Sequence, residues 1–139
     1  MDDLNQAIHI LREALQLLGL EHPDRGWLLS NLAGNLYSRF EKLHATTDMD
    51  ESLSLFRKSL SLLDAEDPRR PSVLGRYVND LRARHKLSGE PEDLEVVLRL
   101  QKECIALLAP GHPHRAEAMI LLSQTLSATA EACTAQDDA

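Results

Sequence analysis

Three kinds of side chain in this sequence could do chemistry: six histidines, two cysteines and several adjacent pairs of acids. His112 and His114 flank a proline without the cysteine or carboxylate partners that zinc sites use. The other histidines are scattered along the chain, and Cys104 and Cys133 are far apart and form no Cys-x-x-Cys pattern. The sequence therefore predicts no metal site, no cofactor and no catalytic residue among the histidines and cysteines.

The common catalytic motifs are missing as well. The chain has no Gly-x-Ser-x-Gly, P-loop, Gly-x-Gly-x-x-Gly or His-Glu-x-x-His pattern. Acid pairs such as Asp2-Asp3 and Glu92-Asp93 fall at expected helix starts, where the helix dipole favours a negative charge. We therefore expect that this protein is not an enzyme.

The polar residues between positions 71 and 87 point to binding. At 100° per residue, the apolar side chains of this segment gather on one face of a helix. The opposite arc carries three bases and one amide but no acid: Arg76, Asn79, Arg82 and Lys86. Arginine and asparagine can hold an acidic segment or a terminal carboxylate through charge-assisted hydrogen bonds. An ordinary solvated helix face would show the same pattern, so both interpretations stay open.

An internal repeat reveals the elements that must position these residues. Pro23, Pro68 and Pro113 lie 45 residues apart, and each is followed two positions later by an arginine. The same register aligns the apolar segments on both sides of each proline, which indicates a repeat architecture. One aligned column contains small residues that suit close packing: Ala14, Ser59 and Cys104.

Each repeat unit contains two amphipathic helical patterns, because its apolar residues recur at intervals of three and four. We expect six helices, near residues 2–19, 25–43, 48–64, 71–87, 91–108 and 114–132. The predicted fold class is all-α, a right-handed helical-repeat solenoid with six helices stacked as three pairs. The expected domain covers 1–133, with units at about 2–46, 47–90 and 91–133, and a disordered tail over 134–139.

The second helical segment of one unit, taken with the first segment of the next, resembles the tetratricopeptide repeat. The residues that match its W-x2-L-G-x2-Y and A-x3-F halves are Leu29, Leu32, Ala33, Leu36, Ser52, Phe56 and Ser59. The unit departs from the family's usual 34 residues, and leucine replaces its large Trp and Tyr. Long units of this type are similar to the repeats of kinesin light chains and of fungal and bacterial arrays that carry a caspase-like CHAT protease domain.

The resemblance implies that the first helix of each tetratricopeptide pair lines a concave, ligand-binding groove. It places these residues in the groove: Ser30, Asn31, Tyr37, Ser38, Arg76, Asn79, Arg82, Lys86 and Gln124. The implied function is a protein–protein interaction scaffold that binds a peptide or helix, with an acidic segment as the candidate ligand. Trp27 would pack at a helix start or touch the ligand at the groove edge.

Charge and hydropathy narrow the class of partner. The net charge of −7 argues against nucleic acid, whose phosphates are bound by lysine and arginine. The N-terminal residues lack the basic and apolar regions of a signal peptide, and no window of 18 residues is apolar throughout. We expect a cytoplasmic protein that binds neither nucleic acid nor a membrane.

The first helical segment supports an alternative function. Ile10 and Leu17 lie beside its main apolar stripe, although terminal repeats normally have a polar outer face. Met1 is a true start, or the chain is a piece of a longer array. The alternative is a structural or oligomerisation segment that self-associates through exposed terminal helices.

Overall fold

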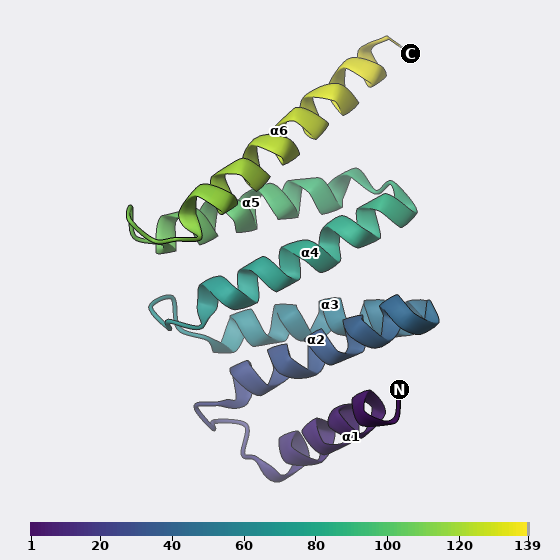
Figure 1. The fold of residues 1–139 in the computed structure, drawn as a ribbon, viewed down its shortest axis with the longest axis vertical. Helices are drawn as coiled ribbons and strands as arrows, with labels where there is room; N and C mark the ends of the chain where they lie inside the picture. Colours follow the sequence, from purple (N-terminus) through teal and green to yellow (C-terminus); the bar gives the residue numbers. More distant parts are fainter. Residues whose placement is uncertain (139) are drawn as a thin grey trace. The chain divides into compact units, whose positions relative to one another are not determined.

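The computed structural model describes residues 1–138, apart from the side chain of Gln136, and all regular structure in this range is helical (Figure 1). The all-α prediction is confirmed. The helices are α1 (Asp2–Leu17), α2 (Arg25–Leu43), α3 (Thr46–Leu62), α4 (Arg70–Ser88), α5 (Pro91–Leu107) and α6 (Arg115–Asp137). Within the described residues, no helix has the length and apolar character needed to cross a bilayer.

The predicted helix ends lie close to the observed ones, except at the end of α6. This helix continues to Asp137, so it includes most of the segment predicted as a disordered tail. Neither glycine nor proline follows Pro113, and alanine, the best helix former, recurs through the segment. The Thr134 hydroxyl also donates to the Glu131 carbonyl within the helix, at 2.8 Å.

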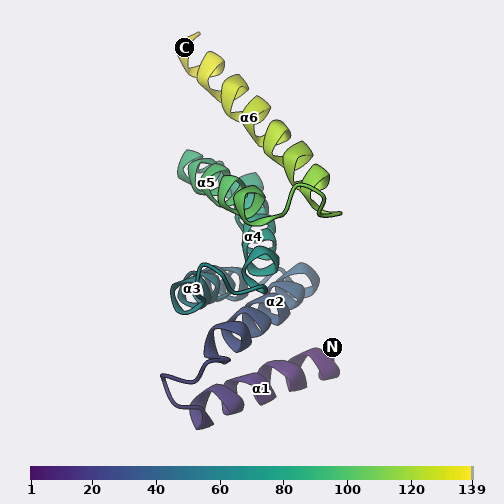
Figure 2. The ribbon, with the colours of Figure 1, turned by 90° about the vertical axis from the view of Figure 1, so that its left-hand side faces the viewer.

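The chain forms two compact units, Met1–Asp80 and the residues from Leu81 onward. The boundary falls inside α4. In the first unit, α1 packs on α2 and α2 packs on α3, as Figures 1 and 2 show. Its core contains fully buried apolar side chains from all four helices: Ile8, Leu36, Leu53, Phe56 and Leu74.

Small residues bring α2 and α3 close together, as the small-residue pattern predicts. Ser52 and Ser59 of α3 are fully buried, and their hydroxyls donate to backbone carbonyls of α2. Ser52 reaches the Ala33 carbonyl at 2.9 Å, and Ser59 reaches the Gly26 carbonyl at 2.6 Å. A Cβ atom on Gly26 would lie 3.2 Å from the Ser59 carbonyl oxygen, so a larger residue would force the helices apart.

The repeated arginine that follows each proline closes the end of the preceding helix. The last carbonyls of a helix have no partner inside it and carry its negative dipole end. The Arg70 guanidinium donates to the carbonyls of Leu60 and Leu63, both at 2.9 Å. Arg25 and Arg115 make the same two bonds at the ends of α1 and α5. The Pro-x-Arg pattern is therefore a C-terminal cap, used three times.

Replacing Arg70 with methionine should lower the free energy of unfolding by about 1–2 kcal/mol, because two carbonyls lose a charged donor. Thermal and urea denaturation would measure the change. The matched control is Lys58→Met on the exposed surface of α3, which should change stability by less than about 0.5 kcal/mol. Equal losses in the two variants would contradict the capping role.

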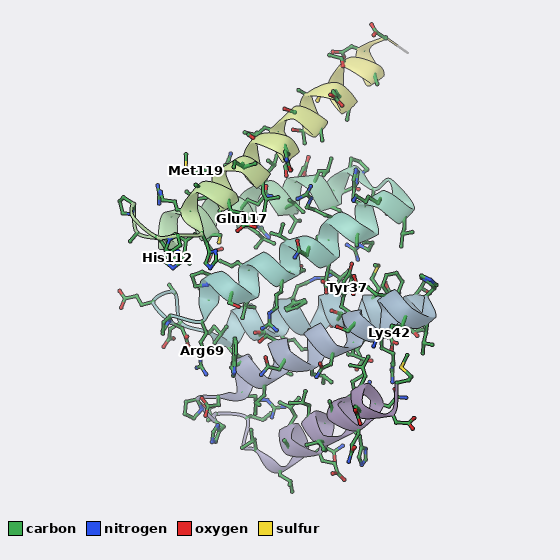
Figure 3. All side chains as sticks on the ribbon, in the orientation of Figure 1. Tyr37, Lys42, Arg69, His112, Glu117 and Met119 are labelled. Atoms are coloured by element: carbon green, nitrogen blue, oxygen red, sulfur yellow. The ribbon has the colours of Figure 1, made fainter. Side chains whose placement is uncertain are left out.

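In the second unit, α5 packs on α6, and Leu94, Val97 and Leu100 of α5 are buried. Arg84 binds both carboxylate oxygens of Asp93, at 3.0 and 2.5 Å. Helix α6 leaves three large apolar side chains exposed, among them Met119, which is labelled in Figure 3: Met119, Ile120 and Leu126.

Candidate functional site

A polar pocket of about 500 Å³ opens on the first unit. Its wall is formed by α1, α2 and α4, and we define it by its lining residues: Leu11, Asn31, Gly34, Asn35, Ser38 and Arg76. The α2 residues repeat at intervals of three and four, which places them on one face of that helix. No carboxylate lines the pocket, so its polar groups are one guanidinium, two amides and one hydroxyl.

Arg76 is the cationic group of the polar pocket, and aromatic rings hold it in place. Its guanidinium carbon lies 5.3 Å from the ring centre of Trp27 and 5.8 Å from that of Phe56. Its Nη2 donates to the Ser30 hydroxyl at 2.9 Å, while its buried Nε has no partner. Trp27 therefore packs against Arg76 beside the polar pocket.

Arg76 makes no ion pair within residues 1–138. The nearest acidic influence comes from Asp80, one helical turn away on α4, whose negative charge favours the charged form of Arg76. Burial of the guanidinium acts in the opposite direction and lowers the pKa of Arg76 from its usual value. A partly desolvated cation without a carboxylate partner gains much from an anionic ligand, because the cost of burial is already present in the free protein.

Three of the predicted groove residues line this pocket, and three others of the first unit, Ser30, Tyr37 and Asn79, do not. Asn31, Ser38 and Arg76 come together in it. Ser30 is fully buried beneath them, where its hydroxyl donates to the Trp27 carbonyl at 2.7 Å, so it positions Arg76 and cannot contact a ligand. The Tyr37 ring, labelled in Figure 3, packs instead against Phe40 at 5.8 Å.

The remaining predicted residues lie outside the polar pocket. Asn79 is exposed on α4. Arg82, Lys86 and Gln124 belong to the second unit, where Lys86 and Gln124 are exposed and Arg82 is half-buried. Arg82, Lys86 and Gln124 therefore do not contribute to the polar pocket.

The groove residues predicted from the sequence do not include Leu11, Gly34 and Asn35, which also line the polar pocket. Asn35 lies between Leu32 and Leu36 in the sequence, and both leucines are buried. A polar residue at this position indicates that its amide faces something other than the core. Gly34 matters because a Cβ atom there would lie 3.2 Å from Nη1 of Arg76 and would crowd the guanidinium. The glycine thus keeps space for the arginine at the pocket.

The histidine-rich turn before α6 does not form a metal site in the described residues. The rings of His112 and His114 lie 5.4 Å apart, and Nδ1 of His114 lies 3.7 Å from Glu117, a carboxylate that the sequence analysis overlooked. Figure 3 labels His112 and Glu117 in this region. No described group of three His, Cys, Asp or Glu residues could hold a metal ion.

Comparison of the chain with family models, with curated proteins and with solved structures gives no match in any of the three. The resemblance to the tetratricopeptide repeat therefore rests on the sequence pattern alone.

Proposed function

We propose that this protein is a protein–protein interaction scaffold that binds an acidic peptide segment in the polar pocket of its first unit. The observation that carries the proposal is Arg76. Its guanidinium is half-buried between two aromatic rings and makes no ion pair within residues 1–138. A peptide carboxylate would supply the missing partner through charge-assisted hydrogen bonds.

The other pocket residues suit the backbone of an extended peptide. An amide side chain offers one acceptor and two donors, so Asn31 and Asn35 can each bond both to N–H and to C=O groups. Ser38 adds a hydroxyl, and Leu11 provides an apolar contact at the α1 side. The pocket has no carboxylate or histidine to act as a general base, which favours binding over catalysis.

The proposal includes a tetratricopeptide-like architecture, a right-handed solenoid built from the 45-residue unit. The recurrence of polar contacts at matched positions supports it. The arginine cap occurs at all three units, and the Arg39–Asp48 pair recurs 45 residues later as Arg84–Asp93. A cytoplasmic location also belongs to the proposal and fits the two free cysteines.

Selection of peptides from a random library on the purified chain tests the proposed function. We expect enrichment of peptides with an acidic segment or a free terminal carboxylate. Arg76→Gln should weaken their binding at least tenfold, since about 1.4 kcal/mol or more of charged hydrogen bonding is lost. Lys58→Gln, which removes an exposed cation from α3, is the control and should leave the dissociation constant unchanged.

Thermal denaturation of Arg76→Gln must accompany the binding measurement, because Arg76 also packs on Trp27. A folded variant that binds the selected peptides as tightly as the unsubstituted chain would refute the polar pocket as the binding site. Failure to enrich any peptide class would also count against the proposed function.

A further inference from the structure

Helix α1 exposes a face that α3 buries. We call this face the outer stripe of α1 and define it as Asp3, Ala7, Ile10, Ala14 and Leu17. At 100° per residue these five positions span an arc about 80° wide. Shifted by the 45-residue repeat, they become the stripe with which α3 packs on α2: Asp48, Ser52, Leu55, Ser59 and Leu62.

The difference in burial between the two stripes is large. Leu55 is 8% exposed in α3, whereas Ile10 at the same repeat position is 54% exposed in α1. Leu62 is 48% exposed, and its counterpart Leu17 is 88% exposed. Asp48 is buried at 5%, while Asp3 lies on the surface. The outer stripe thus has side chains similar to those with which α3 packs on α2, but no helix of the described residues covers it in the same way.

The chain itself shows what covers such a stripe. Helix α2 brings Gly26 and Ala33 against the two serines of α3, and its Arg39 binds both oxygens of Asp48 at 2.7 Å. In the second unit, Arg84 binds Asp93 of α5 in the same way. Helices α3 and α5 therefore each pair this aspartate with an arginine from the preceding helix. Asp3 occupies the same repeat position in α1.

We propose that the outer stripe of α1 is a docking surface for a basic amphipathic partner helix. The partner helix would present small residues to Ala7 and Ala14 and an arginine to Asp3, as α2 does to α3. Helix α6 of a second copy of this chain does not fit this description. Thr129 replaces Arg39 and Arg84 in the repeat register, and no lysine or arginine follows Arg115.

A peptide with the sequence of residues 24–44 tests the docking surface, because it carries Gly26, Ala33 and Arg39 in the required spacing. The labelled peptide is titrated with the whole chain, and its fluorescence anisotropy and helical circular dichroism are followed. We expect saturable binding with a gain of helix. Asp3→Arg and Ile10→Glu should each weaken binding about tenfold or more.

Charge exchange separates this interface from general electrostatic attraction. The peptide with Arg39→Asp should bind the Asp3→Arg chain better than the unaltered peptide does. Asp2→Arg makes the same change of charge one residue away and off the stripe, so it should leave binding nearly unchanged. Equal weakening by Asp2→Arg, absence of rescue, or no binding at 1 mM peptide would overturn the proposal.

Sedimentation of the chain without peptide tests whether a second copy of the chain occupies the outer stripe. We expect the unaltered chain and the Ile10→Glu variant to have the same sedimentation coefficient. If the unaltered chain dimerises and Ile10→Glu makes it monomeric, the outer stripe binds a second copy and the assignment to a basic partner helix is wrong.

Discussion

The Asp80→Asn variant should be more stable than the unsubstituted chain at pH 8, by about 2–3 kcal/mol in the free energy of unfolding. Asp80 is only 3% exposed, and no arginine or lysine forms an ion pair with it in the described residues. The pKa of its carboxyl is raised to about 7, mainly by burial and also by the negative charge of Glu41. Bonding to Ser52 and the positive charge of Arg76 only partly offset this effect.

The hydrogen bonds around Ser52 explain why an amide suits this position. Oγ of Ser52 lies 2.9 Å from the Ala33 carbonyl and 2.6 Å from Oδ2 of Asp80. A hydroxyl has one proton, so it can donate fully to only one of these two acceptors. A protonated carboxyl or an asparagine amide donates to Ser52 and leaves the serine proton for Ala33. The first repeat already has asparagine at this position, Asn35.

The sign of the pH dependence follows from a folded pKa above the unfolded value. Below the ordinary pKa of about 4, Asp80 is protonated in both states and its stabilising contribution is complete. As the pH rises from 4 through 7, the unfolded state loses its proton first and that contribution is lost. The difference in stability between Asp80→Asn and the unsubstituted chain should therefore grow from pH 4 to pH 7 and then level off.

Urea denaturation at several values of pH measures this difference. Asp64→Asn, which makes the same substitution at an exposed turn, is the control. A constant difference for Asp80→Asn across the same range would show that the carboxyl ionises normally in the folded protein.

The sequence predicts the helices well because their apolar residues recur at helical spacing and prolines stand between them. Pro23, Pro68 and Pro113 separate the two helices of each unit. Because the repeats align at 45 residues, a helix predicted in one repeat supports the matching helix in the others. The end of α6 was wrong because no residue there stops a helix. No change in the sequence marks the boundary between the two compact units, since it falls inside the continuous pattern of α4.

The candidate site could be predicted only in part, because a helical wheel gives directions but no depth. The wheel placed Arg76 opposite the apolar face of α4, whereas its guanidinium packs against Trp27 and Phe56. It could not show that Ser30 lies under the guanidinium, or that Leu11 of another helix completes the pocket. The pair Glu92-Asp93 was interpreted as acids that favour a helix start, although Asp93 binds Arg84. The nine-residue spacing of Arg39–Asp48 and Arg84–Asp93 is a sequence signal for such an ion pair.

Replacing Arg39 with methionine should lower the free energy of unfolding by about 2–4 kcal/mol. The Asp48 side chain is 7% exposed and that of Arg39 is 22% exposed, so the substitution leaves a buried carboxylate without its cation. The bond to Arg39 holds the pKa of Asp48 below its usual value. This contribution to stability is therefore present at neutral pH and is lost as the pH falls through the lowered pKa.

The loss should be much smaller when both partners are replaced. Asp48→Leu removes the buried charge, so Arg39→Met/Asp48→Leu should be more stable than Arg39→Met alone. Arg12→Met breaks a bond of 2.9 Å to Glu51 on the surface, and should cost less than about 1 kcal/mol. If Arg39→Met and Arg12→Met cost the same, the Arg39–Asp48 pair would act as a surface ion pair. Asp3 would then gain little from an arginine of a partner helix.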